Sequence, residues 1–117
     1  MNIIRAERVS DPPGFLREKI SPIGAVPETS SVRDYGIDTL PAGSASDLHY
    51  HDCDEWWIIL EGHALVRSKD SDEEAFPGDM IFTPMGVYHG VEALSDVKLI
   101  WLEGPLQGQR RQGHLGS

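Results

Sequence analysis

Residues 43–62 read GSASDLHYHDCDEWWIILEG, and this stretch decides the fold. His49 and His51 are separated by one residue, so on a strand both imidazoles point to the same face. A three-residue turn follows, and Glu55 then opens a run of aromatic and β-branched residues that is typical of a second strand. The stretch therefore predicts a β-hairpin that presents two imidazoles and one carboxylate on a single face.

A second stretch, residues 78–93, reads GDMIFTPMGVYHGVEA and supplies a third imidazole. His89 follows a turn that Pro84 and Gly86 favour, and it can close the same site from a neighbouring strand. Three neutral imidazoles and one carboxylate suit Fe, Mn, Ni, Co or Zn as divalent ions, and they do not suit an all-oxygen calcium site. We therefore predict that one divalent transition metal is bound by His49, His51, Glu55 and His89.

The first stretch resembles the first motif of the cupin superfamily. Gly43, five residues, His49-x-His51, three residues, Glu55, six residues and Gly62 follow that motif without a deviation. The resemblance implies a small single-domain cupin, with an all-β fold that is an antiparallel jelly-roll β-barrel (a double-stranded β-helix). It also implies that the two histidines and the glutamate are metal ligands.

The second stretch is similar to the second cupin motif, with one departure. Gly78, five residues, Pro84-x-Gly86, two residues and His89 match it. The motif normally ends in an asparagine after three further residues, where this chain has Ala93. That asparagine is not a ligand in the family, so the implied ligand set is complete. The absence of the asparagine is expected to affect only a local turn or a hydrogen bond to the residues that support the ligands.

The rest of the chain divides into three parts. Residues 32–104 contain short segments separated by Gly, Pro and Asp, which is typical of a β-sandwich or β-barrel, and they are predicted to form the cupin barrel. Residues 1–31 are predicted to be an N-terminal arm that packs on the barrel, and residues 105–117 a flexible polar tail. Within the arm, residues 15–20 fit either a helical turn or a strand.

Side-chain alternation along the strands predicts which residues surround the metal. If Glu55 points inward, Trp57 and Ile59 point inward as well, and Trp56 points outward. A large apolar side chain on the outer face indicates either a subunit interface or a surface covered by the arm. Because homodimers are common among small cupins, we expect a homodimer.

Further apolar side chains are expected to complete the pocket. In residues 97–103 the pattern leaves open whether Leu99 and Trp101 or their neighbours face inward. Tyr50 and Tyr88, which are adjacent to predicted ligands, are candidates for a catalytic acid or base. The predicted pocket residues are Trp57, Ile59, Met80, Phe82, Val91 and Trp101.

Charge limits the partners that this chain can bind. The 117 residues include 19 acidic and 10 basic side chains, for a net charge of −9. Such a surface repels phosphate backbones and anionic lipids, so we expect no nucleic-acid partner and no membrane partner. The first residues lack the apolar segment of a secretory signal, which favours a cytoplasmic location.

A divalent metal with open coordination positions predicts chemistry on a small-molecule substrate that carries oxygen atoms. Isomerase, epimerase or lyase chemistry with the metal as a Lewis acid is the first hypothesis. An Fe(II)-dependent dioxygenase and a non-catalytic cupin that binds a small molecule are the alternatives. The apolar pocket favours a small, partly apolar molecule over a fully hydroxylated sugar.

Overall fold

Residues 1–107 are the part of the chain that the computed structural model describes, and they form nine strands and no helix. Residues 108–117, most of the predicted tail, lie outside the described residues. In the described part no helix has the length and apolar character that crossing a membrane requires. The strands are β1 (Ala6–Arg8), β2 (Glu18–Pro22), β3 (Asp34–Leu40), β4 (Glu55–Glu61), β5 (Ala64–Ser68), β6 (Asp72–Ala75), β7 (Met80–Thr83), β8 (His89–Ala93) and β9 (Val97–Glu103).

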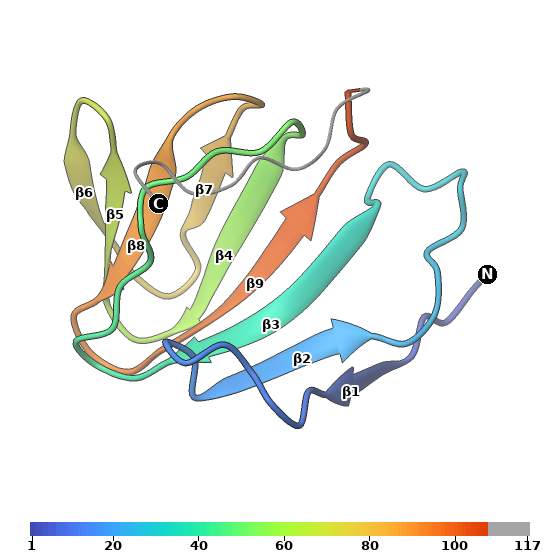
Figure 1. The fold of residues 1–117 in the computed structure, drawn as a ribbon, viewed down its shortest axis with the longest axis horizontal. Coiled ribbons are helices and arrows are strands. Elements are labelled where there is room, and N and C mark those ends of the chain that lie inside the picture. Colours follow the sequence, from blue (N-terminus) through green and yellow to red (C-terminus); the bar gives the residue numbers. More distant parts are fainter. Residues whose placement is uncertain (108–117) are drawn as a thin grey trace.

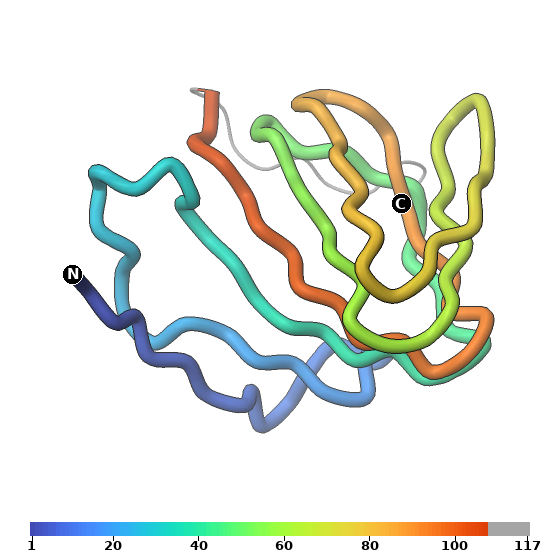
Figure 2. Tube along the Cα trace, turned by 180° about the vertical axis from the view of Figure 1, so that it is seen from behind, coloured from blue at the N-terminus to red at the C-terminus, as the bar shows by residue number. Residues whose placement is uncertain are grey.

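The strands form two antiparallel sheets (Figure 1). One sheet has the order β1-β2-β3-β9-β4-β7, and the other has the order β6-β5-β8. The same two groups of strands are seen from behind in Figure 2. The largest fully buried side chains of the core include Leu40 on β3, Ile59 on β4 and Val97 on β9. This arrangement confirms the predicted all-β, antiparallel jelly-roll fold.

The segment that carries two of the histidines runs beside β8 without forming a long strand. The predicted hairpin between this segment and β4 is therefore wrong, because β4 pairs with β7 and β9 instead. Ala45 and His49 make isolated bridges to Glu92 and His89. The backbone N–H of Ser46 also donates to Val91 O, at 2.8 Å. The chain is therefore held along β8 by backbone hydrogen bonds, which hardly depend on side-chain identity.

Ala93, the departure from the second motif, is part of the hydrophobic core and is 1% exposed. Its backbone N–H donates to Ser44 O, and its C=O accepts from the N–H of Gly43, both at 2.8 Å. Backbone hydrogen bonds thus fix the path of the chain at this point, without the side-chain amide with which the second motif normally ends.

The predicted arm contributes strands to the larger sheet. β1 pairs with β2, and β2 pairs with β3 through Glu18↔Thr39, Lys19↔Asp38 and Ile20↔Ile37. Of the ambiguous residues 15–20, the last three are therefore in a strand. The arm extends the sheet next to the barrel and brings part of β2 to the inside of the fold (Figure 1).

Met80 and Phe82 lie on the outer face of the sheet, contrary to the predicted inward orientation. They are 59% and 52% exposed. Phe82 pairs directly with Trp56, and their rings stack with centroids 5.5 Å apart. Residues directly opposite in an antiparallel pair share a face, so Phe82 follows the outward Trp56, and Ile81 and Thr83 point inward. Alternation alone allows either Met80 and Phe82 or Ile81 and Thr83 to point inward. Pairing with β4 places Ile81 and Thr83 on the inner face.

Candidate metal centre

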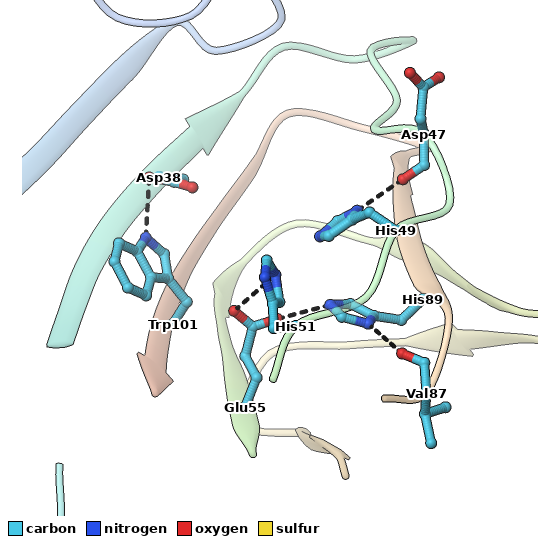
Figure 3. Close-up of polar contacts among 8 residues, drawn as sticks. All are labelled: Asp38, Asp47, His49, His51, Glu55, Val87, His89 and Trp101. Atoms are coloured by element: carbon cyan, nitrogen blue, oxygen red, sulfur yellow. Dashed lines mark hydrogen bonds and ion pairs between the residues drawn. The ribbon is translucent and has the colours of Figure 1, made fainter. Parts of the chain in front are cut away.

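Three histidines and one glutamate meet between the two sheets (Figure 3). His49 and His51 come from the segment beside β8, Glu55 is the first residue of β4, and His89 is the first residue of β8. His49 and His89 are brought together because their backbones exchange two hydrogen bonds, of 3.0 and 2.8 Å. The imidazole ring centroids lie 4.4 to 5.3 Å apart.

The backbone fixes the tautomers of two of the histidines. His49 Nδ1 lies 2.8 Å from Asp47 O, and His89 Nδ1 lies 2.9 Å from Val87 O. A carbonyl oxygen only accepts, so each Nδ1 carries the hydrogen and donates it. In a neutral ring the lone pair is then on Nε2, which is the atom that a metal binds. Both rings therefore turn Nε2 toward the site. The hydrogen that His89 Nε2 donates to Glu55 Oε1 would be replaced by the metal.

Glu55 places its carboxylate between two of the imidazoles. Its Oε1 lies 2.8 Å from His89 Nε2, and its Oε2 lies 3.8 Å from His51 Nε2. Burial by itself raises the pKa of the Glu55 carboxyl, but hydrogen bonds with His89 and Glu103 and the nearby imidazoles hold it below its ordinary value. The carboxylate form, which is the form that binds a metal, is thus favoured.

The donor set fits a divalent transition metal. Single donor atoms of His49, His51 and His89 lie within 4.8 Å of one another. Nitrogen and oxygen ligands lie about 2.0–2.2 Å from such an ion, so two of them are at most about 4.4 Å apart. Small side-chain shifts satisfy that limit. We conclude that the three histidines, with Glu55, form a possible metal site.

A second buried carboxyl group adjoins the site and was not among the predicted residues. Glu103, on β9, is 2% exposed and pairs across the strands with Glu55. One donor atom of each of His51, Glu55 and Glu103 also falls within 4.8 Å of the others. The alternation that turns Trp101 inward also turns Glu103 inward, so the sequence did contain this signal.

Three of the four ligands, His49, His51 and Glu55, line a cavity of about 670 Å³, and residues of the arm form part of its wall. Trp57, Val91 and Trp101 lie in its wall, as the sequence predicted. Ile59 is fully buried in the hydrophobic core and does not line the cavity. Eleven further residues line it. They include Leu99, whose inward orientation the sequence left open, and Phe15, Leu16, Lys19, Asp34, Asp38 and Leu40, which the sequence did not indicate.

Tyr50 and Tyr88, the predicted acid or base candidates, do not line this cavity. Their rings pack edge to face, with centroids 4.8 Å apart. Each is next to a ligand in the sequence and therefore tends to point to the opposite side of the chain. Their catalytic role stays a prediction, and the geometry adds no support to it.

A polar cluster lies in the cavity wall beside the ligands (Figure 3). Lys19 Nζ donates to Asp38 Oδ1 at 3.2 Å and lies 5.0 Å from the centre of the Trp101 ring. Trp101 Nε1 donates to the same oxygen at 3.3 Å. Burial raises the pKa of the Asp38 carboxyl; the contacts with Lys19 and Trp101 oppose this rise, and the Glu55 charge adds to it.

Gly36 makes room for the indole of Trp101. It lies opposite Trp101 in the β3–β9 ladder, and a Cβ at this position would be 2.7 Å from three atoms of the ring. A Gly36→Ala variant is therefore expected to displace the indole and to lower the free energy of unfolding by about 1–3 kcal/mol. Near-UV circular dichroism and thermal denaturation measure the two effects. An unchanged near-UV spectrum would show that the ring does not depend on this glycine.

Two antiparallel sheets with three histidines and one glutamate between them define the class of small jelly-roll proteins with a possible metal site. The cupin domain family profile matches residues 36–104, which is more than half of the chain. The chain therefore belongs to the cupin family. An uncharacterized protein of Sinorhizobium fredii, y4oW, is 38% identical to it over 98 residues. That match covers 83% of this chain and 43% of the relative, so the chain spans less than half of the relative's length.

Several solved structures are similar to this fold. The plu4264 protein of Photorhabdus luminescens has a TM-score of 0.70 and 22% identity, with 90% of this chain and 89% of that chain covered. A predicted oxalate decarboxylase of Thermotoga maritima has a TM-score of 0.69 and 25% identity, covering 88% and 94%. The DMSP lyase DddQ of Ruegeria pomeroyi has a TM-score of 0.58 and 25% identity, covering 68% and 42%.

Proposed function

We propose that this cupin is a metal-dependent enzyme that carries out isomerase, epimerase or lyase chemistry on a small oxygen-bearing substrate. The observation that carries the proposal is the position of the ligands: His49, His51 and Glu55 lie in the wall of a cavity large enough for a small molecule. A closed structural site would use all its positions on protein ligands and would not open into such a cavity.

The ion would act as a Lewis acid that polarises a carbonyl or carboxylate oxygen of the substrate. The contribution of the protein's own residues is to hold and orient the side chains that would bind the metal. Two backbone carbonyls fix the rings of His49 and His89, and Trp57 contacts His89 with ring centroids 5.3 Å apart. The apolar part of the wall, which includes Trp57, Val91 and Leu99, lowers the local polarity, and this strengthens electrostatic interactions beside it.

Two similar structures support the bond-cleaving form of this chemistry. Their names describe a predicted oxalate decarboxylase and a DMSP lyase. Because one fold hosts many reactions, these names support the class of reaction and not a substrate.

A dioxygenase that uses Fe(II) is the second candidate. The observation in its favour is the donor set of three imidazoles and one carboxylate beside an apolar wall that includes Trp57, Val91 and Leu99. Elemental analysis of protein purified without chelator or affinity metal, with an oxygen-uptake assay, separates the two candidates. Iron together with substrate-dependent oxygen uptake supports the dioxygenase, and zinc, manganese or nickel without uptake supports the first proposal.

Removal of the metal is expected to lower the thermal stability of the protein. A ligand that binds only the folded state at about 100 times its Kd stabilises that state by about 2.7 kcal/mol. For a chain of this size, this corresponds to a fall in Tm of about 10 °C on chelation. Differential scanning fluorimetry with EDTA, followed by an excess of Zn(II), measures the fall and its reversal. A Tm that responds to neither addition contradicts metal binding by the native protein.

The homodimer, the cytoplasmic location and the absence of nucleic-acid and membrane partners stay predictions. The stacked Trp56 and Phe82 side chains and the exposed Met80 on the outer face support the homodimer as a proposal.

A further inference from the structure

The cavity wall contains a side-by-side cation and anion that the metal site does not use. Lys19 on β2 and Asp38 on β3 are directly opposite in the antiparallel ladder. Both line the cavity, and their side chains are only 23% and 18% exposed. Lys19 is the one lysine or arginine among the described residues that line the cavity. An ion pair in this position has lost most of its hydration, which costs free energy unless other contacts replace the water.

The contacts of Lys19 and Asp38 leave part of their hydrogen-bonding capacity available for a ligand. Both hydrogen bonds to Asp38, from Lys19 and from the Trp101 indole, fall on Oδ1. A carboxylate accepts at both oxygens, so acceptor capacity is left at Oδ2. An ammonium group has three donor hydrogens, and one of them is used on Asp38. The pair therefore offers a positive donor next to an acceptor.

The pair is also held in place. Lys19 Nζ lies over the face of the Trp101 ring, which attracts a cation. The indole keeps its position because Gly36, opposite it, has no side chain. A ligand-binding pair that is already oriented loses little conformational entropy when the ligand arrives.

The pair and three of the metal ligands, His49, His51 and Glu55, line the same cavity from different parts of the fold. Trp101, which contacts both members of the pair, is opposite Trp57 in the β4–β9 ladder, and Trp57 contacts His89. Figure 3 shows Asp38 and Trp101 next to His51 and Glu55. A molecule that binds the metal can thus extend along this wall.

We propose that Lys19 and Asp38 bind the hydroxy-carboxylate end of a small acid whose other oxygens bind at the metal site. The carboxylate of the ligand accepts a hydrogen bond from Lys19 Nζ, and the neighbouring hydroxyl donates to Asp38. A donor beside an acceptor matches this end group and does not match a simple hydrocarbon or an isolated anion. The inference rests on the proposed function and names its substrate class.

Binding of defined probes to the Zn(II)-loaded full chain tests the inference. Isothermal titration first measures Zn(II) binding, and then the binding of lactate, tartrate and glucarate. Lactate has one hydroxy-carboxylate end, whereas tartrate and glucarate have two, separated by different lengths. Tartrate or glucarate is expected to bind at least 10-fold more tightly than lactate. In Lys19→Met and Asp38→Asn this ratio is expected to fall to about the statistical factor of two, with lactate affinity unchanged.

Lys98→Met on β9 is the matched control, because Lys98 does not line the cavity; it is expected to keep the wild-type ratio. Zn(II) binding and circular dichroism identify any variant that has lost its fold or its metal centre. Equal affinities of all three probes in the wild type, or an unchanged ratio in Lys19→Met with Zn(II) bound, would overturn the inference and leave the proposed function in place. Failure of the wild type to bind Zn(II) would reject the proposed function and the inference with it.

Discussion

A His89→Ala variant is expected to lose at least about 100-fold in affinity for a divalent metal while it keeps its β-sheet fold. The His89 ring is almost fully buried, its Nδ1 is held by Val87 O, and its Nε2 lies 2.8 Å from Glu55 Oε1. Removal of this ring takes away a donor that the backbone has already oriented. The backbone ladder between residues 49 and 89 does not need the imidazole, so the fold is expected to persist.

His63→Ala is the matched control for this experiment. His63 follows the β4–β5 turn, stacks on Phe76 with centroids 4.5 Å apart, and does not line the cavity. Titration with Zn(II) and Mn(II), with circular dichroism on the same samples, should show normal metal binding in this variant. If His89→Ala binds one equivalent with wild-type affinity, the assigned ligand set is wrong.

A Gly62→Ala variant is expected to lower the free energy of unfolding by about 3–5 kcal/mol. Gly62 has a φ of +89°, which costs a residue with a side chain about 1–2 kcal/mol. A Cβ at this position would also overlap the backbone carbonyl oxygen of Asp96, which cannot rotate away as a side chain can. For a chain of this size, Tm is expected to fall by about 12–20 °C.

Gly78→Ala separates the two causes. Gly78 has nearly the same φ, +92°, but no atom lies within 4 Å of the position of its Cβ. Gly78→Ala should therefore lower the free energy of unfolding only through the unfavourable backbone conformation, by about 1–2 kcal/mol. Chemical denaturation of both variants measures the difference. Equal losses in the two variants would mean that the turn at Gly62 moves aside and that the overlap with Asp96 is relieved.

The ligands were predictable because their positions depend on short-range geometry. One residue between His49 and His51, and three residues between His51 and Glu55, keep three donors close together in the chain. They therefore meet at one site although the His49 segment pairs with β8 and Glu55 lies on β4, between β7 and β9. Strand alternation placed Trp57 in the wall. It failed for Phe82, because the phase of a four-residue strand is fixed by its partner strand and not by its own sequence.

The rest of the cavity was not predictable for a related reason. Lys19 meets Asp38 only through the pairing of an arm strand with β3. Alternation places Leu99, Trp101 and Glu103 on one face of β9, but the pairing of β9 with β3 and β4 decides that this face is the inner one. Long-range pairing of this kind leaves no periodic signal in a single sequence. The proline- and glycine-rich arm indicated turns and did not indicate that it would supply a wall.

The candidate metal ligands and most of the remaining cavity wall come from different segments of the same domain. The candidate metal ligands lie within residues 49–89, whereas much of the remaining cavity wall is supplied by residues 15–24 and by β3 and β9. Substitutions in the arm can therefore change what the cavity accepts while the ion stays the same. For protein engineering, the arm is the segment to randomise when a new specificity is sought from an unaltered metal centre.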